Sequence, residues 1–345
     1  MPNVSQLGAY GDTSGSSLMF RNKLINGGFD IWQRGTSQTT SGYGSDDRWG
    51  NENVGSTKTA SRQTFTLGQT DVPLNPKYWS RTVVTSVAGA ANYCNKIQRV
   101  ESVLTLAGQE ATLSFWAKAD ASKNIAVEFV QWFGLGGSPS SIVSGIGVTT
   151  CALTTSWQKF VVTVNIPSIT GKTLGTDLGD FLAAVFWFDA GSSFNARTNS
   201  LGQQSGTFDI ATVQLEAGDQ PTPFEQRPVG TELTLCQRYL AYFGGNNDTF
   251  PGLVLTSATQ ALVLCTFPQP MRRAPVSADF TISAAADVSC RFPSGGQSNS
   301  TSVAFDGASR YTASIIPAGM SGLVAGNCTL ARIQNNGFVY FSAEL

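Results

Sequence analysis

The sequence of 345 residues contains no histidine. Mechanisms that depend on an imidazole side chain are therefore excluded, among them Ser-His-Asp and Cys-His nucleophiles, His-ligated catalytic zinc and the facial triad of non-heme iron. Few routes to enzyme chemistry remain. The sequence thus predicts a protein that is not an enzyme and has no catalytic residues.

Charged residues are also scarce. They make up 13% of the chain, about half of the roughly 25% found in typical soluble proteins. The 22 Lys and Arg residues and the 23 Asp and Glu residues nearly cancel, and the basic residues form no run. Because a basic run or patch is what attracts nucleic acid or anionic lipid, we expect no nucleic-acid partner.

Long hydrophobic runs and clustered cysteines are missing as well. The run FLAAVFWF at 181–188 is strand-sized, whereas a membrane-spanning helix needs roughly 20 apolar residues, so we expect no membrane insertion. The N-terminus has neither the basic start nor the apolar core of a signal peptide, which predicts folding in a cytoplasm. The cysteines form no close pair, and we expect buried thiols that act as small hydrophobes: Cys94, Cys151, Cys236, Cys265, Cys290 and Cys328.

What the chain does contain is a period-two pattern of apolar residues, broken by Gly, Ser, Asn and Pro, from about residue 24 to 226. In one segment, Leu113, Phe115 and Ala117 share a face. No helical segment lies between the strands, so the pattern predicts an antiparallel all-β sandwich. The clearest predicted strands are 111–119, 125–133, 158–167, 181–190 and 206–218.

The stretch INGGFDIWQRG at 25–35 is predicted to be the opening strand of this sandwich. Its glycines would serve a turn and the close approach of a neighbouring strand. The buried face would be supplied by Ile25, Phe29 and either Ile31 or Trp32.

The pattern changes near residue 228, after a proline-punctuated linker. There Leu233, Cys236, Leu240 and Phe243 recur at spacings of three and four, which predicts a helix at about 229–244. Strand patterns return at 245–345 and predict a second, smaller β domain. Residues 1–21 are mostly small and polar, and we expect them to form an extended arm.

Several aromatic residues stand among Gly, Ser, Asn and Pro, where loops expose their side chains. Because a sugar ring stacks on a flat aromatic side chain, four of them are candidate carbohydrate-binding residues: Tyr43, Tyr78, Trp79 and Trp132. By contrast, Trp116 and Trp187 lie in strongly apolar strands, and we expect them to pack in the core or on a sheet face.

A structural calcium site is a further hypothesis. If the first and last strands of the sandwich pair, Asp30 and Asp209 could join backbone oxygens of the Gly27-Gly28 turn around Ca²⁺, which takes six to eight oxygen ligands. The predicted ligands are Gly28, Asp30 and Asp209. The alternative is that both carboxylates are solvated or bonded to a turn.

Four motifs occur in a fixed order over about residues 22–243: LINGGFDIWQRGTS, GYGSDDRW, TLAGQEATLSFWAKAD and FDIATVQLEAGDQPTPFEQRPVGTELTLCQRYL. Together they resemble a family of tailed-bacteriophage tail-fibre and receptor-binding-type proteins. In that family a jelly roll similar to carbohydrate-binding modules opens with the first motif and closes with the last. The segments FPQPMRRAP and SAEL resemble, more weakly, the small β domain that often ends such proteins.

The resemblance implies a bacteriophage virion protein, assembled in the cytoplasm of a bacterial host. Residues 22–228 would form the jelly roll and bind a host-surface glycan. The protein would be a homotrimer, and the arm at 1–21 would contact other virion proteins. Related jelly rolls carry a structural Ca²⁺ between their first and last strands, which matches the three positions named above.

Two alternatives keep the same fold. In the first, the protein is a head fibre, a capsid decoration or a tail-assembly protein, and Leu233, Leu240 and Phe243 either bundle around a threefold axis or pack on their own domain. In the second, it is a polysaccharide depolymerase, which would need a carboxylate pair such as two of Asp46, Asp47 and Glu52.

Overall fold

The computed structural model describes residues 20–345 except 246–247, 255–256 and 292–294. The chain divides into two compact units, Met1–Arg227 together with Leu345, and Pro228–Glu344. Residues 1–19 of the predicted arm lie outside the described residues.

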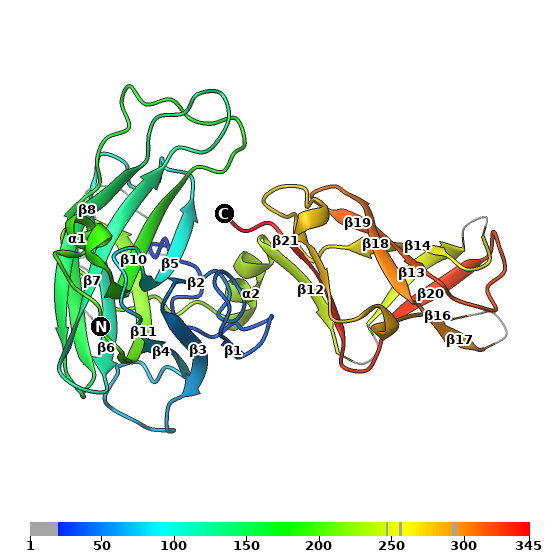
Figure 1. The fold of residues 1–345 in the computed structure, drawn as a ribbon, viewed down its shortest axis with the longest axis horizontal. Helices are drawn as coiled ribbons and strands as arrows, with labels where there is room; N and C mark the ends of the chain where they lie inside the picture. The colour runs from blue at the N-terminus through cyan, green and yellow to red at the C-terminus, as the bar shows by residue number, and fades with distance from the viewer. Residues whose placement is uncertain (1–19, 246–247, 255–256, 292–294) are drawn as a thin grey trace, which may run out of the picture. The chain divides into compact units, whose positions relative to one another are not determined.

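The first unit is a jelly-roll sandwich of two antiparallel sheets, and the prediction of an all-β fold is confirmed (Figure 1). The six-stranded sheet has the order β1 (Ser37–Gln38), β3 (Thr57–Thr64), β4 (Tyr78–Thr85), β11 (Gly206–Ala217), β6 (Glu110–Ala119), β9 (Gln158–Asn165). The five-stranded sheet has the order β2 (Gly50–Val54), β5 (Tyr93–Glu101), β10 (Phe181–Ala190), β7 (Lys123–Trp132), β8 (Val143–Leu153).

The core of the first unit follows from the period of two along its strands, because alternate side chains of a strand face the opposite sheet. In β6, Leu113, Phe115 and Ala117 are fully buried, as their spacing predicts. From the other sheet, Phe186 meets Phe115 edge to face, with ring centroids 5.0 Å apart. All seven tryptophans of the chain belong to this unit.

The segment 25–35 is not a strand, and that prediction is wrong: the first strand is β1. Asn26 adopts a left-handed backbone conformation with φ 57°. Its buried side chain donates to the carbonyl oxygens of Ile31 and Asp47 at 2.8 and 3.0 Å, and accepts from the Ile31 N–H at 2.9 Å. The segment is therefore a loop folded around one amide, with Phe29 fully buried below it.

Gly27 of this loop lies against the last strand of the sandwich. Its carbonyl oxygen accepts from the Val213 N–H at 2.9 Å. A Cβ atom at position 27 would lie 2.1 Å from the Val213 carbonyl oxygen. Only glycine fits this close approach, as the sequence suggested, although it occurs in a loop.

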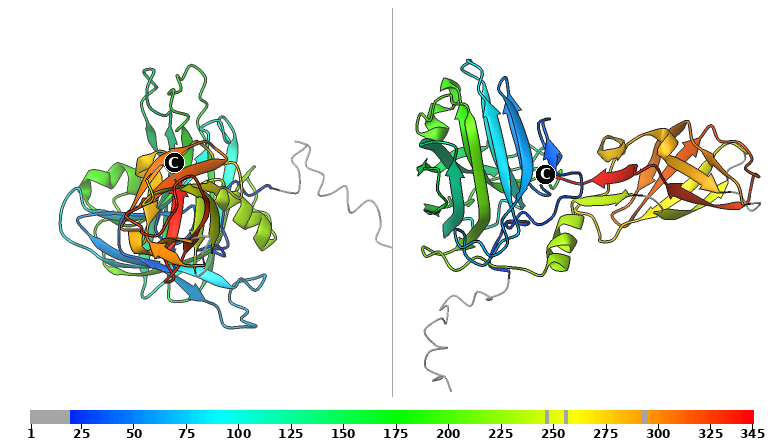
Figure 2. Two further views of the ribbon diagram at one scale, coloured as in Figure 1. Left: turned by 90° about the vertical axis from the view of Figure 1, so that its right-hand side faces the viewer. Right: turned by 90° about the horizontal axis from the view of Figure 1, so that it is seen from below.

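The second unit contains two further antiparallel sheets. One has the order β12 (Leu240–Gly244), β21 (Phe338–Ser342), β15 (Phe280–Ile282). The other has the order β17 (Gln297–Asn299), β16 (Val288–Arg291), β20 (Cys328–Ile333), β13 (Thr249–Val254), β14 (Ala261–Thr266), β19 (Thr312–Ala318), β18 (Ser302–Ala308). Figure 2 shows the same strands from two other sides.

The helices are short, and none in the described part of the chain is long and apolar enough to cross a membrane. They are the 3-10 turns η3 (Ser192–Phe194), η4 (Ser277–Asp279) and η5 (Ala285–Asp287), and the α-helices α1 (Asn195–Thr198) and α2 (Val229–Gln237).

The helix predicted at 229–244 ends at Gln237, and Leu240 and Phe243 lie on strand β12. Both pair with β21, Leu240 opposite Ser342 and Phe243 opposite Val339. The run YLAYF is rich in aromatic residues, which favour strands and override the short helical spacing. Since Leu240 is buried and Phe243 packs on the core of the second unit, both stabilise their own unit.

Cysteine burial follows the prediction with one correction. None of the six cysteines forms a disulfide; five are buried, and Cys328 is exposed. Burial raises the pKa of Cys265 and of Cys94 to about 12. These buried thiols stay protonated near neutral pH, whereas Cys328 is open to reagents.

Candidate functional site

The outer face of the six-stranded sheet carries a tryptophan on β6, the strand next to the edge strand β9. Because Leu113, Phe115 and Ala117 of β6 face the core, Ser114, Trp116 and Lys118 face outward. Trp116 is half-buried. On one side it pairs with Lys159 of β9, and on the other with the small Ala211 of β11. A small neighbour leaves room beside the indole ring.

A hollow of about 310 Å³ lies beside Trp116. Its walls come from β6, β9, the bulge of β11, the loop between β3 and β4, and the segment that follows β11. The lining residues are Pro73, Leu74, Ser114, Phe115, Trp116, Lys159, Thr212, Pro221, Pro223 and Phe224. The hollow thus combines aromatic rings with an amine and two hydroxyl groups.

A β-bulge places Thr212 in this wall. The pairing of β11 with β6 shifts register between Ala211 and Gln214, and Thr212 has φ 46°. A β-branched residue rarely adopts this left-handed conformation, and such strain is found where a bulge redirects a side chain. Within the described residues, the buried Oγ1 of Thr212 has no hydrogen-bond partner. A buried hydroxyl without a partner destabilises the fold, and Thr212 is one of the residues that line the hollow.

A group of aromatic side chains stands on the same face. The ring of Trp79 on β4 lies 4.5 Å from that of Phe65 and 5.8 Å from that of Trp157. All three residues are half-buried. The Lys118 amine lies 5.2 Å from the Trp157 ring centroid, and the Arg81 guanidinium 6.0 Å from that of Trp79.

The predicted carbohydrate-binding residues fall on both sheets. Trp79 belongs to the aromatic group just described. The neighbouring Tyr78 lies at the start of β4, and its ring contacts two cations, Arg62 at 4.5 Å and Lys77 at 5.0 Å.

Tyr43 lies in the loop before β2, and Trp132 lies on β7 of the five-stranded sheet. Trp132 stacks on Phe181 with centroids 6.4 Å apart. Arg99 lies over both Phe181 and Tyr43, at 5.5 and 5.8 Å, and its Nη1 donates to the Tyr43 hydroxyl at 3.0 Å. Arg99 also pairs with Glu52 at 2.5 Å. This second aromatic group already has its polar partners within the protein.

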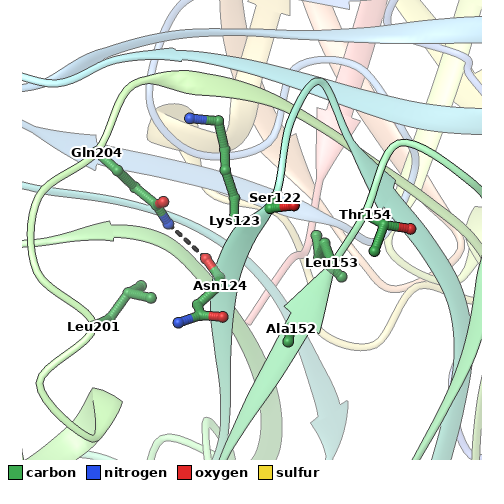
Figure 3. A pocket seen from close by; sticks show the side chains of 8 residues that line it. All are labelled: Ser122, Lys123, Asn124, Ala152, Leu153, Thr154, Leu201 and Gln204. Carbon is green, nitrogen blue, oxygen red and sulfur yellow. Dashed lines mark hydrogen bonds between the residues drawn. The ribbon is translucent and has the colours of Figure 1, made fainter.

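A second hollow, of about 410 Å³, lies near the start of β7 and is shown in Figure 3. Gln204 donates to the Asn124 carbonyl oxygen at 2.5 Å, and the Lys123 amine donates to the Ser205 carbonyl oxygen at 2.8 Å. No aromatic ring lines it; its residues are Ser122, Lys123, Asn124, Ala152, Leu153, Thr154, Leu201 and Gln204. It offers hydrogen bonds but no surface for stacking.

The residues predicted to bind calcium do not fit the ion. Both carboxylate oxygens of Asp209 accept from Arg81 at 2.8 Å, and Lys118 lies 4.0 Å away. These hydrogen bonds raise the pKa of Arg81. A Cβ at Gly28 would meet Oδ2 of Asp30 at 2.8 Å, so the Asp30 side chain turns back on its own loop. The described residues include no group of three or more His, Cys, Asp or Glu side chains that could hold a metal.

The sequence analysis missed Trp116, Trp157, Thr212 and Phe224 as site residues. For Trp116 a signal was present, because the alternation that buries Phe115 and Ala117 places Trp116 on the other face. For Thr212 the sequence contains no such signal, since the position of a β-bulge depends on how the strand pairs with its partner strand.

No family model matches the chain, and no curated protein matches it. Among solved structures, the chain resembles a putative sugar binding protein from Bacteroides thetaiotaomicron at 16% identity and TM-score 0.35, covering 57% of this chain and 100% of the other. It also resembles a carbohydrate-binding module titled CBM4, at 16% identity and TM-score 0.31, covering 56% and 98%. A third is the enzymatically active domain of tailspike protein 4 of bacteriophage CBA120, at 13% identity and TM-score 0.32, covering 57% and 22%. At these identities the likeness concerns the fold alone.

Proposed function

We propose that the first unit binds a glycan in the hollow beside Trp116. The observation that carries the proposal is the buried, unpartnered hydroxyl of Thr212 in a wall shared with the Trp116 ring. A sugar ring presents a C–H face to an aromatic ring and hydroxyl groups around its edge. Trp116 supplies the stacking surface, while Thr212, Ser114 and Lys159 supply hydrogen bonds.

The size of the hollow supports one or two sugar units at a time. Its volume of about 310 Å³ is at the lower end of the range of roughly 300–1,000 Å³ for small-molecule sites. The aromatic group of Phe65, Trp79 and Trp157 extends the same face and would contact further units of a longer chain. We therefore propose a polysaccharide rather than a free monosaccharide as the ligand.

We further propose that the protein is a non-enzymatic bacteriophage virion component of the tail-fibre or receptor-binding type. The ordered motifs between residues 22 and 243 support this role, as does the absence of histidine. A homotrimer, attachment to other virion proteins through the N-terminal arm and assembly in the host cytoplasm are part of the proposal.

Affinity electrophoresis in gels that contain polysaccharides extracted from candidate bacterial hosts tests glycan binding. We expect at least one polysaccharide to retard the wild-type protein and to have little effect on Trp116→Ala. The matched control is Trp132→Ala on the opposite sheet, which should be retarded like the wild type. If no polysaccharide from a susceptible host retards the protein, or if only Trp132→Ala loses retardation, the site is wrongly assigned.

Two further measurements separate the virion roles. Antibody labelling of intact particles should place the protein at the tail, whereas label on the capsid shell would indicate a decoration protein. Incubation with the retarding polysaccharide should release no reducing ends, and their release would reveal a depolymerase.

A further inference from the structure

A lysine, an asparagine and an aspartate meet inside the sandwich of the first unit. Asn51 of β2 and Lys96 of β5 are direct partners across the two antiparallel strands. Asp46 comes from the loop that precedes β2. The side chains of Lys96 and Asp46 are 1% and 0% exposed, and Asn51 is fully buried.

Each of the three groups contacts the other two. The Lys96 amine donates to Oδ1 of Asn51 at 2.5 Å and forms an ion pair with Oδ2 of Asp46. Nδ2 of Asn51 donates to Oδ1 of Asp46 at 2.7 Å. The Lys96 amine therefore lies beside the side-chain carbonyl of Asn51, and the Asp46 carboxylate contacts both the Lys96 amine and the Asn51 amide nitrogen.

Aromatic rings close this cluster off from water. The Lys96 amine lies 5.8 Å from the ring centroid of Phe29 and 5.9 Å from that of Trp49, and both rings are fully buried. A desolvated lysine next to a proton acceptor is a nucleophile, and neighbours held in contact react as if at very high concentration.

The charges within the cluster allow the required proton transfer. Burial lowers the pKa of Lys96. Burial alone would raise the pKa of Asp46, but the Lys96 ammonium and the hydrogen bonds outweigh it and hold that pKa below its usual value. The resting state is therefore an ion pair, and its proton can pass from Lys96 to Asp46 along the hydrogen bond that joins them.

We propose that Lys96 and Asn51 join in an intramolecular isopeptide bond, with Asp46 carrying the proton. Lys96 first passes a proton to Asp46, and the neutral amine then attacks Cγ of Asn51. A bond forms between Nζ of Lys96 and Cγ of Asn51, and the bond between Cγ and Nδ2 breaks. Asp46 returns its proton to the leaving nitrogen, which also takes one from Nζ, so that ammonium departs and Asp46 is again a carboxylate. No oxidant or cofactor is needed.

The bond would tie β2 to β5 and close a covalent loop that contains β3 and β4. It would add to the first unit a crosslink that no reducing agent breaks, in a chain whose six cysteines form no disulfide. Such a link suits a protein that must withstand conditions outside a cell.

Intact mass spectrometry of the denatured wild-type protein tests the proposal. We expect a mass lower than that of the sequence by one ammonia, and, after digestion, a branched peptide that joins Lys96 to Asn51. A wild-type mass equal to that of the sequence overturns the proposal. Loss of one water with Lys96 joined to Asp46 overturns the assignment to Asn51.

Variants separate this bond from other ways of losing ammonia. Asp46→Asn should have the full mass, whereas the control Lys58→Arg, at another buried lysine near the cluster, should keep the loss. A succinimide at Asn26-Gly27 would lose the same mass, and ammonia loss without the branched peptide overturns the proposal. Tryptophan fluorescence checks that Asp46→Asn folds. If this variant does not fold, the mass of the wild-type protein and the presence or absence of its branched peptide still test the proposal.

Discussion

Replacing Asn26 by alanine should strongly destabilise the first unit. The Asn26 side chain is fully buried and makes three hydrogen bonds, to the carbonyl oxygens of Ile31 and Asp47 and from the Ile31 N–H. Alanine leaves the Ile31 N–H and the Asp47 carbonyl oxygen without these partners, whereas the Ile31 carbonyl oxygen keeps its hydrogen bond from the Asp47 N–H at 3.1 Å. It also places a residue that disfavours a positive φ at a position where φ is 57°.

The expected loss follows from these contacts. A buried polar group left without a partner costs about 1–3 kcal/mol, and two such groups give about 2–6 kcal/mol before relaxation. Water entering the space left by the amide lowers this sum, whereas the left-handed backbone adds roughly 1–2 kcal/mol. We therefore expect a loss of about 3 kcal/mol or more in the free energy of unfolding.

Urea unfolding followed by tryptophan fluorescence measures this loss directly, because all seven tryptophans lie in the first unit. Asn26→Gly is the matched control, since it loses the same hydrogen bonds but tolerates the positive φ, and should be roughly 1 kcal/mol more stable than Asn26→Ala. If Asn26→Ala unfolds within about 1 kcal/mol of the wild type, the amide does not organise the loop.

Three further outcomes are expected. Burial lowers the pKa of Lys58 to about 8, so on raising the pH the folded chain loses this proton before the unfolded chain does, and the free energy of unfolding rises. Relative to Lys58→Met, the wild type should gain about 1.4 kcal/mol in the free energy of unfolding from about pH 7 to about pH 9. A difference between the two proteins that does not change with pH would contradict the burial of the amine. A thiol reagent should modify Cys328 rapidly in the folded protein and the five buried cysteines only after denaturation. Rapid modification of several cysteines in the folded protein would show that the cores open. Chelation of calcium should leave the thermal midpoint unchanged, because Arg81 holds Asp209; a lower midpoint would point to a bound ion.

The regular strands of the sandwich could be predicted because one face of each is buried. The run at 181–190 coincides with β10, and that at 206–218 differs from β11 by one residue. A period of two is enough to define such strands, since it is a local property of the sequence.

Features set by contacts between distant residues could not be predicted. The loop at 25–35 has apolar residues at strand-like positions, yet Asn26 folds it around carbonyl groups as far away as Asp47. Lys96 and Asp46 are 50 positions apart, and nothing near either residue indicates that they meet inside the core. The unpartnered hydroxyl of Thr212 likewise depends on the register between β11 and β6.

The measurement that tests the glycan site most directly is a calorimetric titration of Thr212→Val with the polysaccharide that retards the wild-type protein in the gel. The thermal unfolding of the variant is measured in parallel. Valine has nearly the same shape but no hydroxyl, so the variant should be more stable than the wild type and bind several-fold more weakly. Trp116→Ala should weaken binding at least about tenfold, or about 1.4 kcal/mol. Unchanged affinity in both variants would contradict binding in this hollow.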